Sequence, residues 1–161
     1  MTQASQPDAR FVVRDLIEST ADELDRLTNL FDLYRVHYDQ AADGPRTRRW
    51  LDENIASRQI SAFVGEDRGT FVGFAITVSV PASLRLRHFW QIRDLFVLPS
   101  HRRLGVAQLL LGRVSAAAIE ADALRLTLAT EVNNFAALDL YSRCGYTTVE
   151  GYCSLELPLE Q

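Results

Sequence analysis

Arg102-Arg103-Leu104-Gly105-Val106-Ala107 stands where a predicted strand gives way to a predicted helix. The preceding run, Ile92 to Val97, is rich in the bulky apolar residues typical of a buried strand. Beyond it, apolar residues recur in steps of three and four, which predicts a helical stripe: Leu104, Ala107, Leu111, Val114, Ala118 and Ala121. The first amides of a helix lack intrahelical partners and carry the positive end of its dipole. A basic turn with small residues at that position predicts a phosphate-binding site.

The loop matches neither of two familiar phosphate-binding motifs. The sequence contains no G-x-G-x-x-G and no G-x-x-x-x-G-K-[ST], so a nucleotide-binding α/β domain fits poorly. The hexapeptide R-x-x-G-x-A instead resembles the pyrophosphate loop [QR]-x-x-G-x-[GA] of the GNAT superfamily, the acetyl-CoA-dependent N-acetyltransferases. In that family the loop follows a strand directly and opens a helix.

A second, independent segment strengthens this resemblance. Residues 134–146 read N-x-x-A-x-x-L-Y-x-x-x-G-[FY], which is similar to the second cofactor segment of the family. Asn134 is a good helix N-cap, Ala137 and Tyr141 lie four residues apart on one face, and Gly145 provides a left-handed stop. The two segments occur in the family's order.

The resemblance covers roughly residues 60–157 and is most specific at 94–107 and 134–146. It implies an α/β fold with a mixed, largely antiparallel central sheet, helices on both faces and two splayed parallel strands. We expect those two strands at His88–Val97 and Leu124–Thr130, with the pantetheine arm between them. Acetyl-CoA would bind as co-substrate, without a metal, at Leu95, Phe96, Val97, Arg102, Arg103, Leu104, Gly105, Val106, Ala107, Asn134, Ala137 and Tyr141.

The rest of the chain fits one N-acetyltransferase domain over residues 1–161, with residues 1–9 disordered. Earlier strands are predicted at Phe11–Arg14, Ile60–Val64 and Phe71–Val80. Helices are predicted after the capping box Thr20-x-x-Glu23 and over Thr47–Ile55. A final hairpin is predicted at Thr147–Glu150 and Tyr152–Leu157.

The composition of the chain argues against some classes of binding partner. A net charge of −4 argues against binding nucleic acid by bulk electrostatics. Neither a signal peptide nor an apolar run near membrane-spanning length occurs, so we expect a cytoplasmic protein that does not bind membranes. Since family members often pair, and Tyr152–Leu157 would leave an open strand edge if outermost, we also predict a homodimer.

The reaction that the resemblance implies is direct acetyl transfer to a primary amine, of a small molecule or a protein, in a ternary complex. Tyr141 occupies the place of the family's tyrosine general acid toward the CoA thiolate. The amide of Phe96 or Val97 would stabilise the oxyanion. Residue 91, a glutamate in some members, is Gln91 here, so no general base is evident. A non-catalytic acyl-CoA-binding regulatory module therefore stays open as the alternative.

Asp94 is the one carboxylate in the strand His88–Val97. A carboxylate in an otherwise apolar strand is costly to bury without a partner. Two interpretations follow: a salt bridge to Arg93 or Arg102, or a role at the acceptor site. In the second, Asp94 would bind the acceptor's ammonium group or take its proton through water.

Three aromatic residues are candidates for the same acceptor site. Tyr34 and Tyr38 follow helical spacing, so each is either a core residue or part of the pocket wall. Trp90 has the same parity as Asp94 and is therefore expected on the same face of the strand. Aromatic faces attract cations, which predicts a cationic acceptor.

Overall fold

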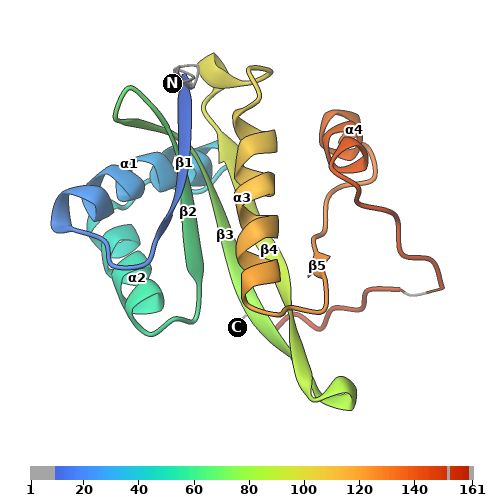
Figure 1. Ribbon diagram of the computed structural model, residues 1–161. Helices are drawn as coiled ribbons and strands as arrows, with labels where there is room; N and C mark the ends of the chain where they lie inside the picture. Colours follow the sequence, from blue (N-terminus) through green and yellow to red (C-terminus); the bar gives the residue numbers. More distant parts are fainter. Residues whose placement is uncertain (1–9, 152, 160–161) are drawn as a thin grey trace, which may run out of the picture. The chain divides into compact units, whose positions relative to one another are not determined.

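The computed structural model describes residues 10–151 and 153–159, so the segment predicted to be disordered, 1–9, lies outside the described residues. The chain divides into two compact units, one up to residue 129 and one from residue 130. The described part of the larger unit contains a five-stranded sheet and three α-helices (Figure 1). Among the described helices, none combines the length and apolar character needed to cross a bilayer.

The strands lie side by side in the order of the sequence: β1 (Phe11–Leu16), β2 (Ser61–Asp67), β3 (Thr70–Ala82), β4 (Arg87–Val97) and β5 (Leu126–Thr127). Neighbours are antiparallel except β4 and β5, which are parallel. The predicted mixed, largely antiparallel sheet with helices on both faces is thus confirmed. β5 lies inside the predicted run Leu124–Thr130, but only two of its residues pair.

The helices begin where side chains cap them. α1 (Ala21–His37) starts at the predicted capping box, in which the Glu23 amide donates to Thr20 Oγ1 at 3.2 Å and the Thr20 amide donates to Glu23 Oε2 at 2.9 Å. α2 (Gly44–Ala56) starts at Asp43, whose Oδ1 accepts from the Arg46 amide at 3.2 Å. α1 and α2 cover one face of the sheet (Figure 1).

α3 (Val106–Glu120) covers the other face (Figure 1). It begins two residues later than the predicted stripe, because Gly105 has a left-handed φ of 91° that no helical residue adopts. Leu104 is consequently 44% exposed. The stripe that packs on the sheet is Val106, Leu110, Leu111, Val114, Ala117 and Ala118.

β4 contains a bulge at Arg93. Asp94 and Ile92 pair with consecutive residues of β3, so Arg93 is an extra residue in the ladder. One extra residue reverses the faces to which the side chains on its two sides point. Asp94 therefore faces α1 and α2, whereas Ile92 and Trp90 face α3.

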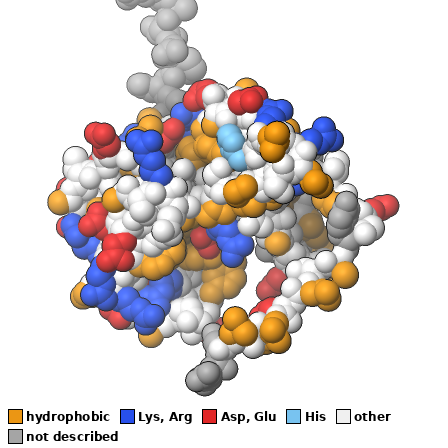
Figure 2. All heavy atoms as spheres, turned by 90° about the horizontal axis from the view of Figure 1, so that it is seen from below, with side chains coloured by type: hydrophobic (Ala, Val, Ile, Leu, Met, Phe, Trp, Pro, Cys, Tyr) orange, Lys and Arg blue, Asp and Glu red, His pale blue; other side chains and the backbone are white. Residues whose placement is uncertain are grey.

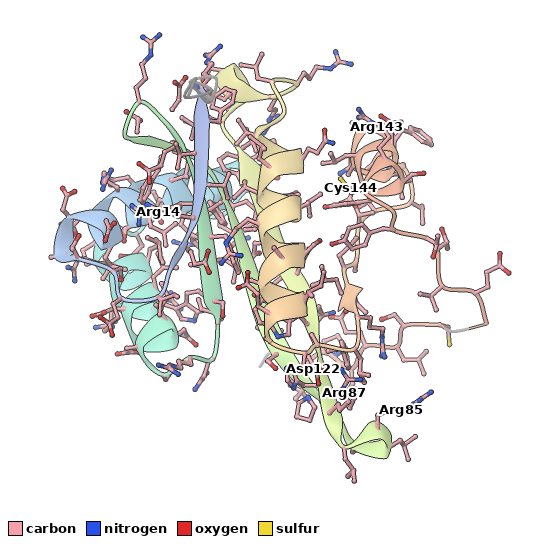
Figure 3. All side chains as sticks on the ribbon, in the orientation of Figure 1. Arg14, Arg85, Arg87, Asp122, Arg143 and Cys144 are labelled. Atoms are coloured by element: carbon pink, nitrogen blue, oxygen red, sulfur yellow. The ribbon has the colours of Figure 1, made fainter. Side chains whose placement is uncertain are left out.

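Ion pairs attach the middle of α3 and the turn after it to the sheet. Arg113 Nε and Nη2 donate to the two carboxylate oxygens of Asp15 on β1, at 2.6 and 2.7 Å. After α3, Asp122 Oδ1 lies 2.6 Å from Arg87 Nη2 at the start of β4 (Figure 3). Arg85, on the short turn between β3 and β4, stands apart from this pair in the same view. Because the side chains of Arg113 and Asp15 are less exposed than those of Arg87 and Asp122, the pair between α3 and β1 is the less screened of the two.

The smaller unit contains α4 (Phe135–Arg143), capped as predicted: Asn134 Oδ1 accepts from the Ala137 amide at 3.2 Å. Gly145, with φ 88°, follows its end. Residues 147–151 and 153–159 form no strand, so the predicted final hairpin is wrong there, and its residue 152 lies outside the described part. Alternating apolar residues form a strand only where a neighbouring strand is available to pair with them. The strand edge given as one reason for a homodimer is therefore absent from these residues, and the homodimer itself stays a prediction.

Gly73 allows α3 to approach β3. A Cβ at this position would lie 3.0 Å from the Phe96 carbonyl oxygen, 3.1 Å from Val97 Cγ2 and 3.2 Å from Val106 Cγ1. We expect Gly73→Ala to lower the free energy of unfolding by about 1–3 kcal/mol, the usual cost of overpacking. Gly112, inside α3, has open space at its Cβ position, so Gly112→Ala should raise the free energy of unfolding by about 0.5–1 kcal/mol. Urea unfolding measures both; a Gly73→Ala protein of wild-type stability would contradict this packing.

Candidate active site

The turn between β4 and α3 has the backbone expected of an anion site. Arg103 and Gly105 both adopt left-handed conformations, with φ of 61° and 91°. α3 begins with no side-chain cap and no acidic residue in its first turn. Its first amides therefore keep their donors available for an anion. A Cβ on Gly105 would have no atom within 4 Å, so the space beside these amides is open.

The side chains of this loop divide between structure and surface. Arg102 Nε donates to the Val97 carbonyl at 3.0 Å, and its guanidinium lies 5.8 Å from the centroid of the Phe96 ring. Arg102 thus ties the loop to the end of β4. The side chain of Val106 is buried against the sheet, which leaves its amide as the group available to a ligand. The other loop residues expected to bind the cofactor are exposed or half-buried: Arg103, Leu104, Gly105 and Ala107.

β4 and β5 pair over a short stretch only. Trp90 and Gln91 have partners in β5, and the later residues of β4 have none in the described ladder. The Trp90 amide also donates to the Arg125 carbonyl at 3.0 Å, just before β5. One edge of β4 is therefore unpaired from Arg93 to Val97, which matches the predicted splay of two parallel strands.

The backbone groups on that unpaired edge follow from the β3–β4 ladder. The Leu98 amide donates to the Val72 carbonyl of β3 at 2.9 Å. In an antiparallel ladder, backbone groups alternate between the two edges of a strand. The Phe96 amide therefore faces β3, whereas the amides of Leu95 and Val97 face the unpaired edge. The prediction that the Phe96 amide is available for an oxyanion is wrong.

Asp94 lines a cavity of about 560 Å³ between the sheet and helices α1 and α2. Tyr34 Oη donates to Asp94 Oδ1 at 2.6 Å, and no described residue forms an ion pair with this carboxylate. The predicted salt bridge to Arg93 or Arg102 is thus wrong. Burial raises the pKa of the Asp94 carboxyl above its ordinary value, against the opposing effects of the Tyr34 hydrogen bond and the Arg93 charge. Its second oxygen, Oδ2, accepts no hydrogen bond from the described residues.

Tyr34 belongs to the core and to the site at once. Its ring packs against the rings of Phe31, Phe74 and Phe96, with centroids 5.4 to 5.7 Å apart. Burial, followed by the hydrogen bond to Asp94, raises the pKa of the Tyr34 hydroxyl above its ordinary value. The hydroxyl therefore stays protonated and fixes the orientation of the carboxylate. Tyr38 is 55% exposed and meets the Tyr34 ring edge-on at 5.1 Å.

Trp90 does not join this group. Its ring lies 6.4 Å from that of Phe63, on the face of the sheet that α3 covers. The prediction that Trp90 and Asp94 wall one cleft is wrong, because the bulge at Arg93 breaks the parity on which it rested.

Three further predicted site residues lie on or beside α4 in the smaller unit. The side chain of Asn134 is engaged in the cap, where it accepts from the Ala137 amide. The ring of Tyr141 meets that of Tyr146 edge-on, with centroids 5.8 Å apart. The Tyr141 carbonyl accepts from the Tyr146 amide at 3.0 Å, which closes the turn after the helix.

Residues 24–146 match the family model described as acetyltransferase (GNAT) family. The chain belongs to the GNAT family of acetyltransferases. It is 31% identical over 123 residues to the uncharacterized N-acetyltransferase YhfO of Bacillus subtilis (strain 168), covering 76% of this chain and 83% of that relative. The crystal structure of a probable acetyltransferase superposes with a TM-score of 0.83 at 26% identity, covering 93% of this chain and 99% of the other.

An aminoglycoside acetyltransferase from an uncultured soil metagenomic sample shares the fold, with a TM-score of 0.77 at 17% identity, over 96% of this chain and 100% of that one. Within the described residues of this GNAT acetyltransferase, no three His, Cys, Asp or Glu side chains are grouped to hold a metal ion.

Four arginines that no motif indicated line the cavity beside Asp94: Arg35, Arg46, Arg49 and Arg93. The sequence feature that could have indicated Arg46 and Arg49 is their helical spacing with Trp50 and Glu53, which places them near these residues on α2.

Asp94 should make this GNAT protein less stable as pH rises. Because the folded pKa is raised, the folded chain holds the proton more tightly than the unfolded chain, whose pKa is about 3.9. Stability is therefore lost as pH rises through the folded pKa. Asp94→Asn keeps an oxygen to accept the Tyr34 hydrogen bond, so we expect it to exceed wild type in stability at pH 7 but not near pH 3. Thermal unfolding at both pH values tests this; a less stable variant at pH 7 would indicate a compensated charge instead.

Proposed function

We propose that this GNAT acetyltransferase moves the acetyl group of acetyl-CoA directly to a primary amine in a ternary complex. One observation supports this proposal above all. At the end of β4, an unpaired strand edge leads directly to the uncapped N-terminus of a helix. The loop 102–107 would hold the pyrophosphate through the first amides of α3. The outward amides of Leu95 and Val97 would bind the pantetheine arm and the thioester carbonyl.

The chemistry begins with a proton. An alkylamine with a pKa near 10.4 is protonated at neutral pH and must lose a proton before it attacks. Asp94 is the group we assign to this step, directly or through water, because its Oδ2 is unpartnered beside the cavity and burial raises its pKa. Tyr34 acts as a positioning residue that holds Oδ1.

The transfer then needs stabilisation of two charges. The amine nitrogen attacks the thioester carbon, and the carbonyl oxygen becomes an oxyanion that the amide of Leu95 or Val97 would stabilise. Collapse of this intermediate breaks the C–S bond and releases CoA as thiolate. Tyr141 would give the sulfur its proton, leaving the N-acetylated amine and CoA as products.

A non-catalytic acyl-CoA-binding module would need the same loop but no proton acceptor. The unpartnered oxygen of Asp94 supports the enzyme. The test is a panel of amines with acetyl-CoA, monitoring free thiol and the mass of the acetylated product. Transfer to any amine above the rate of hydrolysis supports the proposal; tight acetyl-CoA binding with no transfer across the panel would favour the module.

Gly105→Glu should abolish acetyl-CoA binding, because it places a carboxylate and bulk beside the amides assigned to the pyrophosphate. The matched control is Gly69→Glu in the β2–β3 turn, where φ is 80° and the Cβ position is also open. Both variants carry the same charge and similar backbone strain. Calorimetric titration with acetyl-CoA should show loss of binding in the first alone, and retained affinity there would refute the assignment of the loop.

Tyr141→Phe should lower kcat by about tenfold or more with little change in acetyl-CoA affinity, because the hydroxyl acts on a leaving group formed after attack. Tyr146→Phe removes a hydroxyl from the neighbouring ring and serves as the control. Single-turnover rates separate chemistry from product release. If Tyr141→Phe retains the wild-type single-turnover rate, Tyr141 is not the general acid.

A further inference from the structure

We infer that the acceptor is a small molecule that carries an anionic group, a carboxylate or a phosphate, in addition to the amine. The inference rests on the proposed function and specifies the acceptor of the same site. It depends on the charges around the Asp94 cavity, which differ between its half-buried and its exposed parts.

The cavity has an acidic group in its half-buried part, an apolar wall, and three exposed arginines with one exposed carboxylate, that of Glu53. Asp94 is half-buried, whereas Arg46, Arg49 and Arg93 are exposed. The apolar lining includes Phe31, Ile60, Ile76 and Val78. A volume of about 560 Å³ lies in the range of small-molecule sites, which favours a small acceptor over a protein surface.

Two of these arginines lack a charge partner. Among the described residues, no carboxylate lies within ion-pair distance of Arg46 or Arg49, including Glu53 on the same helix. Arg48, which does not line the cavity, pairs instead with Asp25, at 2.5 Å between Nε and Oδ1. The cavity therefore holds guanidinium groups that no carboxylate of the described chain neutralises.

The other two arginines are partly engaged. Arg35 Nη1 lies 3.3 Å from Asp32 Oδ1 and donates to Thr47 Oγ1 at 3.1 Å. Arg93 Nη1 donates to the side-chain oxygen of Gln91 at 3.3 Å, and its charge acts on the neighbouring Asp94, although the two form no ion pair. Figure 2 shows basic side chains on several parts of this face, with the largest group at its lower left, and since the sequence contains no lysine, all of them are arginines.

The arginines around the cavity limit which cationic acceptors can bind there. A polyamine would place its second ammonium group among the arginines, where like charges repel. A guanidinium fork binds a carboxylate or a phosphate through paired, charge-assisted hydrogen bonds. An acceptor with its amine at Asp94 and an anion at Arg46 and Arg49 satisfies both kinds of charge that line the cavity.

The test compares acceptors that differ only in the anion. Thiol release is measured with ω-amino carboxylates of increasing length against their amides, with O-phosphoethanolamine against ethanolamine, and with polyamines and acidic peptides. We expect the best anionic acceptor to exceed its neutral partner in kcat/KM by about tenfold or more. Arg46→Gln combined with Arg49→Gln should bring that ratio close to one, while the control Arg48→Gln should leave it unchanged.

The outcomes separate this inference from the proposed function. Equal or better transfer to the neutral amines or polyamines would overturn the anionic acceptor and leave acetyl transfer intact. Transfer to acidic peptides alone would overturn the small-molecule class. An unchanged ratio in the double variant would remove the arginines from recognition. No transfer to any amine would overturn the proposed function, and the inference with it.

Discussion

The bulge at Arg93 in β4 is the constraint on which the arrangement of the site depends. By adding one residue to the ladder, it turns Asp94 toward α1 and α2 and leaves Trp90 under α3. Without it, the alternation of the strand would place both side chains on one face. The carboxylate instead enters a layer of aromatic rings, where the Tyr34 hydroxyl is its hydrogen-bond donor. The bulge thus places a carboxylate where these aromatic rings meet the cavity.

β4 offers two different surfaces as a result. Its unpaired edge presents backbone amides, which recognise a ligand without regard to side chains, and its end leads into the uncapped N-terminus of α3. Its face presents Asp94 to the cavity under α1 and α2. Backbone recognition fits a substrate common to the GNAT family, while side chains from α1 and α2 fit an acceptor that differs between members. The same strand can therefore bring one constant and one variable substrate together.

Much of this was predictable from local sequence. The capping box at Thr20, the cap at Asn134 and the strand–turn–helix around Gly105 each depend on residues close in sequence, and all three form. The bulge was not predictable, because the alternation of side chains along the sequence of β4 does not indicate where an extra residue enters the ladder. The final hairpin was predicted from alternation alone and does not form in the described residues, since a strand also needs a partner ladder. The arginines of α2 reach the Asp94 cavity only through tertiary packing of helix on sheet.

In the proposed function, the unpaired edge of β4 and the loop after it hold acetyl-CoA. The most direct measurement follows backbone amide resonances of ¹⁵N-labelled protein while CoA is added. We expect the largest shifts at Leu95, Val97 and Gly105, with a smaller change at Phe96, whose amide faces β3. Saturable binding that leaves Leu95, Val97 and Gly105 unshifted while other elements respond would contradict it.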